Sequence, residues 1–334
     1  MPILLPHEST NPKVSTLQGI HLYHSKNSFC SRQVRLALAI KRIEYISHEL
    51  DIEHKKENIA KHYLGINPRG LVPTLVHNGK VIIETIDILK YVDSMKNNDK
   101  TTVRLIPGPD HDTIVQLVER IDTLHQYIQT IALCRLPRSM QKSTARNSHK
   151  GITAITTQWQ DRTKEKTTKS MTIGGILETK ANGQSLQKRY TFWRQLSTRD
   201  FREKEKATAY SLLFDEFLKF ETTLENTDYL LGNKSNDVLT LVDVTWWVVI
   251  GRFLNVLRDV KKEQFRQHVP KLWKWHERLS SRIEFKAEIE EDTFLMKMMV
   301  GYKRTTDVSN ATAFAVFCVG LTMLYMLIKY ENGM

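Results

Sequence analysis

Residues 67–75 read Asn-Pro-Arg-Gly-Leu-Val-Pro-Thr-Leu, and this stretch constrains the fold more than any other. Pro73 has no backbone N–H to give to a sheet ladder, so we expect it to open a strand and not to lie within one. Two apolar segments then flank Asn78-Gly79, the dipeptide most typical of a two-residue β-hairpin turn. The stretch therefore predicts a turn that leads directly into an antiparallel hairpin.

The residues upstream predict a strand, a polar turn and a helix. Residues 20–24 alternate apolar and polar side chains, as a half-buried strand does, and residues 25–31 are polar. Apolar residues then recur at helical spacing from Val34 to Ile40. A helix that starts directly after a strand offers free backbone amides at its N-terminus, where an anion or a thiolate is stabilised.

This order of elements resembles the thioredoxin-like N-terminal domain of glutathione transferases, and residues 28–35, 67–73 and 84–85 carry the resemblance. The resemblance implies glutathione as co-substrate, bound by Val72, Pro73, Glu84 and Thr85. In that family the bond before the proline is cis, and the backbone of the preceding residue, here Val72, pairs with the cysteinyl part of glutathione. Glu84 and Thr85 would bind the γ-glutamyl end.

Two residues are candidates for the catalytic role. Ser28 lies where the resemblance implies a hydroxyl that stabilises the glutathione thiolate, but a serine at this position is equally suited to cap a helix. Cys30 could instead form a mixed disulfide with glutathione, or it could be a small buried residue. Both alternatives remain open for each residue at this stage.

The resemblance extends to a second, all-helical domain. Residues 114–131 show apolar side chains at three- and four-residue spacing, and Thr240-x-x-Asp243 is a capping box that precedes an apolar segment. Glutathione transferases use such a box to begin the central helix of their helical domain. The expected fold class is therefore α/β plus all-α, the glutathione transferase fold, with a transmembrane helix added at the C-terminus.

Charge and cysteine content narrow the functional classes. Of the +12 formal net charge, +10 falls within residues 137–207, which hold 16 Lys or Arg against 6 Asp or Glu. Because the excess is confined to one segment, no nucleic-acid partner is expected. Cys30, Cys134 and Cys318 lie far apart in sequence, and the histidines are dispersed, so neither a disulfide framework nor a metal site is predicted.

Residues 311–328 form an uncharged segment near the C-terminus, Ala-Thr-Ala-Phe-Ala-Val-Phe-Cys-Val-Gly-Leu-Thr-Met-Leu-Tyr-Met-Leu-Ile. As a helix these residues would span about 27 Å, close to the thickness of a bilayer's hydrocarbon core. Lys303 and Arg304 precede the segment, which favours a cytosolic location for the residues before it. We therefore predict a single C-terminal membrane anchor.

These features divide the chain as follows: a lead-in at residues 1–18, a thioredoxin-like glutathione-binding domain at 19–95, a linker at 96–111, an all-helical domain at 112–300 with a basic insertion at about 137–206, a linker at 301–310, the anchor at 311–328 and a tail at 329–334.

The combination of this fold, an insertion and an anchor resembles the tail-anchored ganglioside-induced differentiation-associated protein 1-like group. That resemblance favours the mitochondrial outer membrane, with the endoplasmic reticulum as the alternative because residues 329–334 are short and not strongly basic.

Two functions are open. One is a membrane-anchored transferase that conjugates an electrophile to glutathione or reduces a disulfide substrate, with a homodimer as a further expectation. The other is a tethered interaction or regulatory protein with weak catalysis, acting in mitochondrial dynamics or redox sensing.

Overall fold

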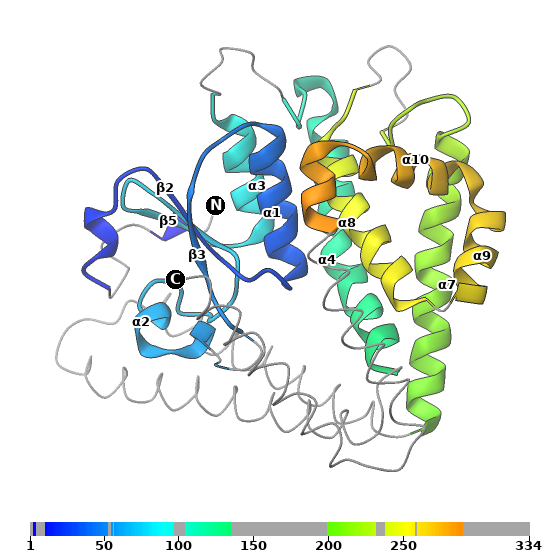
Figure 1. Cartoon of the computed structure of the whole chain (residues 1–334), viewed down its shortest axis with the longest axis horizontal. Helices are drawn as coiled ribbons and strands as arrows, with labels where there is room; N and C mark the ends of the chain where they lie inside the picture. The colour runs from blue at the N-terminus through cyan, green and yellow to red at the C-terminus, as the bar shows by residue number, and fades with distance from the viewer. Residues whose placement is uncertain are drawn as a thin grey trace, which may run out of the picture. The chain divides into compact units, whose positions relative to one another are not determined.

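The computed structural model describes residues 3–4, 11–52, 55, 57–96, 104–134, 199–231, 238–257 and 259–289. The chain divides into two compact units, residues 1–285 and residues 286–334. The first unit contains every helix and strand named below, with the strands and α1–α3 in blue to cyan and the later helices in green to orange (Figure 1).

Five strands form one sheet in the order β1-β5-β4-β2-β3. The strands β2 and β3 are parallel, and the β1–β5, β5–β4 and β4–β2 pairs are antiparallel. The elements of this part of the chain are β1 (Ile3–Leu4), η1 (Val14–Thr16), β2 (Ile20–His24), α1 (Phe29–Ile40), β3 (Ile46–Glu49), η2 (Glu57–Ile59), α2 (Lys61–Leu64), β4 (Thr74–His77), β5 (Lys80–Ile82) and α3 (Thr85–Ser94).

The predicted hairpin is confirmed. Asn78 and Gly79 have φ values of 48° and 78°, and they join β4 to β5 with His77 paired to Lys80. Positive φ at both central residues is what the right-handed twist of the flanking strands requires, and Asn and Gly tolerate it best.

Helices cover both faces of the sheet (Figure 1). On one face Tyr63 of α2 joins a buried apolar cluster with Val76 and Val81, which are cross-strand partners. Strand alternation turns Leu75 and Ile82 to the opposite face, where they are also buried and where α1 and α3 pack against each other. The two-sided burial explains why β4 and β5 have apolar side chains at consecutive positions, Leu75-Val76 and Val81-Ile82.

The lead-in contributes more to this domain than the sequence suggested. Ile3 and Leu4 pair with Ile82 and Val81 of β5 and so add a strand to the sheet. Val14 is only 1% exposed and packs in the same cluster as Tyr63. Sequence reasoning missed both because a two-residue strand has no periodicity to detect.

The later helices form an all-helical region, as the sequence predicted. The helices α4 and α7 pack against each other, and α4 also packs against α8. Their bounds, with those of the remaining elements, are η3 (Gly108–Asp110), α4 (His111–Cys134), α7 (Arg199–Thr223), α8 (Leu241–Val256), α9 (Asp259–His268) and α10 (Pro270–Ser280).

The capping box of α8 is present and saturated. The Asp243 carboxylate accepts hydrogen bonds from Thr240 N (3.0 Å), Thr240 Oγ1 (3.1 Å), Leu230 N (2.9 Å) and Trp275 Nε1 (3.1 Å). Both Asp243 and Thr240 are fully buried. Burial raises the pKa of the Asp243 carboxyl to about 6, against the opposing effect of its four donors. One side chain therefore ties the start of α8 to the preceding loop and to α10.

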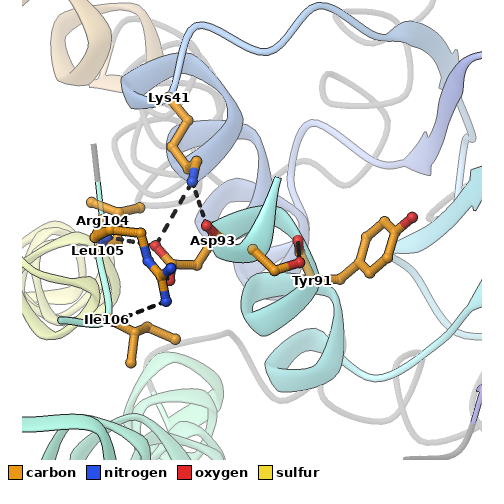
Figure 2. A network of polar contacts seen from close by, with 7 residues as sticks. Lys41, Tyr91, Asp93, Arg104, Leu105 and Ile106 are labelled. Atoms are coloured by element: carbon orange, nitrogen blue, oxygen red, sulfur yellow. Dashed lines mark hydrogen bonds and ion pairs between the residues drawn. The ribbon is translucent and has the colours of Figure 1, made fainter. Parts of the chain in front are cut away.

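A buried polar junction joins the sheet and its helices to the all-helical region, both within residues 1–285 (Figure 2). Lys41, at the C-terminal end of α1, is fully buried and donates to Asp93 O (2.5 Å), with its Nζ 3.8 Å from Asp93 Oδ1. Asp93 also accepts from Arg104 Nε (3.0 Å) and Leu105 N (2.6 Å), and Leu105 O accepts from Leu241 N (2.7 Å) at the start of α8. Burial lowers the Lys41 pKa, while Asp93 raises it and Arg104 lowers it further. The junction fixes residues 104–105 against α1, α3 and α8.

The sequence predicted a basic insertion that extends to about residue 206, but α7 already begins at Arg199. The added turns hold alternating Arg, Glu and Lys residues, which are good helix formers, and Lys206 pairs with Glu203 at 3.0 Å. Apolar periodicity cannot reveal such turns because they consist largely of charged residues. The rest of the predicted insertion, residues 137–198, lies outside the described residues.

The predicted anchor at residues 311–328 also lies outside the described residues. Within the described part of the chain, no helix has both the length and the apolar character needed to cross a bilayer.

Candidate active site

The strand register brings the predicted site segments to one edge of the sheet. Tyr23 pairs with Thr74, and Leu75 pairs with Ile82. The chain therefore leaves β2, enters β4 and leaves β5 at the same end of these strands. The turn before α1, the Val72-Pro73 bond and the start of α3 all lie at that edge.

Ser28 is the N-cap of α1. Its hydroxyl oxygen accepts a hydrogen bond from Ser31 N at 3.2 Å, and the residue is half-buried. This is the capping role that the sequence left open. It does not exclude the other role, because accepting this bond uses a lone pair of the hydroxyl and not its proton.

Cys30 lies in the first turn of α1 as a half-buried cysteine that forms no disulfide with another described residue. It is therefore not a fully buried packing residue. The first turn of α1 contains no acidic residue, so no side-chain charge there opposes the positive end of the helix dipole.

The turn before β4 is held by buried polar side chains. Asn67 is 1% exposed, and its amide donates to Leu71 O (3.0 Å) and Thr74 Oγ1 (2.8 Å). Tyr63 also bonds to both of these groups, and burial raises its pKa above the usual value. Residues 67–74 therefore have one well-defined shape.

The Val72-Pro73 peptide bond is cis, as the resemblance implied. Pro73 is buried and Val72 is half-buried. The backbone N–H and C=O of Val72 form no hydrogen bond to another residue in the described ranges. This edge therefore presents a backbone donor and acceptor to which an extended peptide can bind.

Glu84 and Thr85 follow β5, with Thr85 as the first residue of α3. Glu84 has φ +69° and ψ 126°, a conformation rare for a residue with a side chain. Its carboxylate forms an ion pair with Arg69 Nη1, and both side chains are partly exposed. The sequence did not single out Arg69, because nothing local indicates that a residue 15 positions upstream reaches Glu84.

The turn that leads to Ser28 is organised by Arg35 of α1. Arg35 is 6% exposed and donates to Ser25 O (3.1 Å), Lys26 O (3.2 Å) and His24 Nδ1 (3.2 Å). Burial and the Arg35 charge lower the His24 pKa to about 4. A neutral His24 accepts from Arg35 at Nδ1 and donates from Nε2 to Ser47 Oγ at 2.7 Å.

The structure brings two of the dispersed histidines together. His21 Nδ1 and His48 Nε2 are 2.9 Å apart, and the His48 ring stacks on Tyr23. His21 Nε2 donates to Gln18 O, so its Nδ1 is the acceptor for His48. No group of three or more metal-binding side chains occurs in the part of the chain that the structure describes.

Comparison with known proteins supports the glutathione S-transferase superfamily. Residues 27–95 match the family model described as glutathione S-transferase, N-terminal domain, which covers all the site segments above. The chain is 34% identical over 79 residues to glutathione S-transferase 1 of Dianthus caryophyllus, a match that covers 24% of this chain and 35% of the relative. The chain thus spans about a third of the length of this curated relative.

Solved structures extend the likeness to the fold of most of the chain. The β-etherase LigF from Sphingobium sp. strain SYK-6 aligns with a TM-score of 0.56 at 18% identity, over 82% of this chain and 100% of that one. The theta class glutathione S-transferase from Xanthomonas axonopodis pv. citri, solved with glutathione bound, aligns with a TM-score of 0.52 at 15% identity, over 82% and 98%. The thioredoxin-like sheet and the helical region together form a glutathione transferase fold.

Proposed function

We propose that the chain is a glutathione transferase-like enzyme that binds glutathione at the sheet edge formed by Ser28, Val72 and Glu84-Thr85. The observation that carries this proposal is the convergence, at one edge, of a capped helix N-terminus, a free backbone donor–acceptor pair beside a cis-proline, and a carboxylate beside a hydroxyl. Each feature alone is common. Together they complement a thiol-containing tripeptide.

The Arg69–Glu84 pair complements the γ-glutamyl end of glutathione, which carries an ammonium and a carboxylate. Glu84 offers a carboxylate to the ammonium, and Arg69 and Thr85 offer donors to the carboxylate. Because the Arg69–Glu84 ion pair is preformed and partly exposed, the ligand can interact with both charged groups where they lie. The Val72 backbone would bind the cysteinyl residue as an added strand segment.

Ser28 and the N-terminus of α1 would stabilise the glutathione thiolate. A free thiol has a pKa of about 8.5, so ionisation near neutral pH needs a hydroxyl donor and a positive helix end. In conjugation, the thiolate sulfur forms a bond to an electrophilic carbon and the leaving group departs with its electron pair. With a disulfide substrate, the thiolate forms a mixed disulfide and the other sulfur leaves as a thiolate.

Calorimetric titration of the full-length protein with glutathione tests this proposal directly, with thiolate absorbance of the bound ligand followed against pH. We expect saturable binding at millimolar glutathione or below and a thiol pKa lower than that of free glutathione. Absence of binding at these concentrations would contradict the enzyme function. Binding without a lowered thiol pKa would leave a glutathione sensor in place of a transferase.

We also propose that residues 311–328 anchor the protein in an organelle membrane, with the mitochondrial outer membrane favoured by the resemblance to the tail-anchored group. The uncharged segment preceded by Lys303 and Arg304 supports this proposal. A truncation after Asn310 should leave the membrane fraction. If it stays there after a high-salt wash, the anchor lies elsewhere, whereas release by salt alone would point to the basic insertion.

A tethered interaction or regulatory role is the second candidate function. The +10 charge of residues 137–207, an insertion in the sequence of the predicted helical domain, favours it. The glutathione titration separates the two functions, because only the enzyme requires a bound thiolate.

A further inference from the structure

Three consecutive backbone carbonyls lead into Ser28, and each accepts a hydrogen bond from an arginine. Arg35 donates to Ser25 O (3.1 Å) and Lys26 O (3.2 Å). The third carbonyl, Asn27 O, accepts from Arg252 Nη2 at 2.9 Å. Two guanidinium groups thus hold the whole turn between β2 and α1.

Arg252 comes from the all-helical region. It lies 225 residues after Asn27, on α8, the buried helix whose start is fixed by Asp243. The helices α1 and α8 also pack directly against each other. The Arg252 donor is therefore carried by a buried helix that packs directly against α1.

The contact acts on Ser28 through the peptide plane. Asn27 C=O and Ser28 N–H belong to one planar peptide unit, so a bond that fixes the carbonyl also fixes the direction of the N–H. Ser28 N in turn donates to Ser25 O at 3.1 Å, and Ser28 Oγ accepts from Ser31 N. The Ser28 backbone is thus held through the Asn27–Ser28 peptide unit, and its hydroxyl oxygen is held by Ser31 N.

We propose that Arg252 is a positioning residue by which the helical region holds the Ser28 turn in the geometry that serves a bound thiol. The link to catalysis rests on the proposed glutathione function. The control of the turn by Arg252 does not depend on that function, so either claim can be contradicted while the other stands.

Hydrogen–deuterium exchange of the ligand-free, full-length protein tests the control of the turn. Arg252→Met removes the donor at similar side-chain length, and Arg252→Lys keeps the charge but not the guanidinium fork. Arg266→Met on α9 is the control, because that side chain is 59% exposed and pairs with Glu263 on its own helix. We expect roughly tenfold faster exchange of the Ser28 and Ser31 amides in Arg252→Met, an intermediate value in Arg252→Lys and wild-type values in the control.

Wild-type exchange of these two amides in a folded Arg252→Met would overturn the proposal. An equal increase in the amide exchange rates of α10 and the sheet would also overturn the proposal, since it would show a general loss of stability and not a local role. If Arg252→Met does not fold, Arg252→Lys decides: a local increase supports the positioning role, and wild-type exchange overturns it.

Steady-state kinetics tests the link to the thiol. We expect Arg252→Met to lower kcat about tenfold with little change in the KM for glutathione, and Arg252→Lys to restore part of kcat. A rise in KM alone would overturn the link, because it would place Arg252 in ligand binding. If the wild type binds no glutathione, the proposed function fails, but the exchange experiment still decides whether Arg252 holds the turn.

Discussion

The N-termini of α1 and α8 are both capped by a hydroxyl residue, yet their surroundings differ in every other respect. Ser28 caps α1 at a half-buried position, and Cys30 lies two residues later in the first turn. Thr240 caps α8 where it is fully buried, and the Asp243 carboxylate there has four donors. The Ser28 hydroxyl accepts one hydrogen bond and keeps its proton available, whereas the Asp243 carboxylate at the second cap has no further acceptor capacity.

The difference separates two uses of one local motif. A saturated, buried cap holds the helical region together, because each of its bonds would be costly to leave unmade. A partly exposed cap at a sheet edge contributes less to stability and can instead receive a ligand. Substitutions at the two caps should therefore change different quantities.

The largest effect should come from removing the saturated cap. Asp243→Ala leaves Leu230 N, Trp275 Nε1 and Thr240 N buried without an acceptor, and we expect a loss of about 3–5 kcal/mol in the free energy of unfolding. Denaturant titration measures it. Asp243→Asn, which keeps one acceptor oxygen, should lose clearly less. A loss below about 1 kcal/mol for the alanine variant would show that the cap is not the main support of α8.

The same carboxyl should make stability depend on pH with a defined sign. Its pKa rises from 3.8 in the unfolded chain to about 6 in the fold, so the folded state binds the extra proton. Its contribution is therefore present in full below pH 4 and is lost as the pH rises through about 6, by about 3 kcal/mol.

His24 and His276 have the opposite effect, since burial lowers each pKa to about 4 and their contribution is lost as the pH falls. The measurement is therefore the difference in unfolding free energy between wild type and Asp243→Asn across pH 4–7. A difference that is flat over this range, or that rises with pH, would contradict the raised Asp243 pKa.

At the site edge, Glu84→Ala should weaken glutathione binding by about 1.5–3 kcal/mol, or one to two decades in Kd, because it removes a charge-assisted contact. Calorimetric titration measures the change, and Glu57→Ala, in η2, is the control for loss of an acidic charge from the domain. An unchanged Kd for Glu84→Ala would remove Glu84 from the binding site.

A matched pair separates the backbone of Glu84 from its side chain. Glu84→Gly and Glu84→Ala both remove the carboxylate, but only glycine adopts φ +69° without strain. We expect the glycine variant to be about 1 kcal/mol more stable than the alanine variant in thermal or denaturant unfolding. Equal stability would mean that the fold relaxes this conformation at little cost.

A small effect on stability should come from the half-buried cap of α1. Ser28→Ala should cost about 1 kcal/mol of unfolding free energy and hardly change glutathione affinity, but it should raise the pKa of the bound thiol and lower turnover at neutral pH. Cys30→Ala is the control, and it should be close to neutral unless a mixed disulfide is an intermediate. A turnover loss for Ser28→Ala no larger than its binding loss would assign Ser28 to capping alone.

Local sequence signals predicted much of this architecture. Asn78-Gly79 defined the hairpin, the apolar segment after Thr240 and Asp243 defined the buried α8, and the segment before Pro73 indicated the site edge. Each of these signals lies within a few residues of the structure that it specifies. Such short-range preferences can be recognised in the sequence because the backbone geometry of a turn, a cap or a strand start admits few residue types.

The tertiary structure alone decided how the site is assembled. The positive φ of Glu84, its pairing with Arg69, the three carbonyls held by Arg35 and Arg252, and the burial of Lys41 against Asp93 follow from how β4, β5, α1, α3 and α8 pack. A long charged side chain can reach many partners from one position, and its sequence neighbours do not say which of them the fold will bring within reach. The sequence by itself therefore determined the elements and the edge at which they meet, and packing determined which charges fix that edge in place.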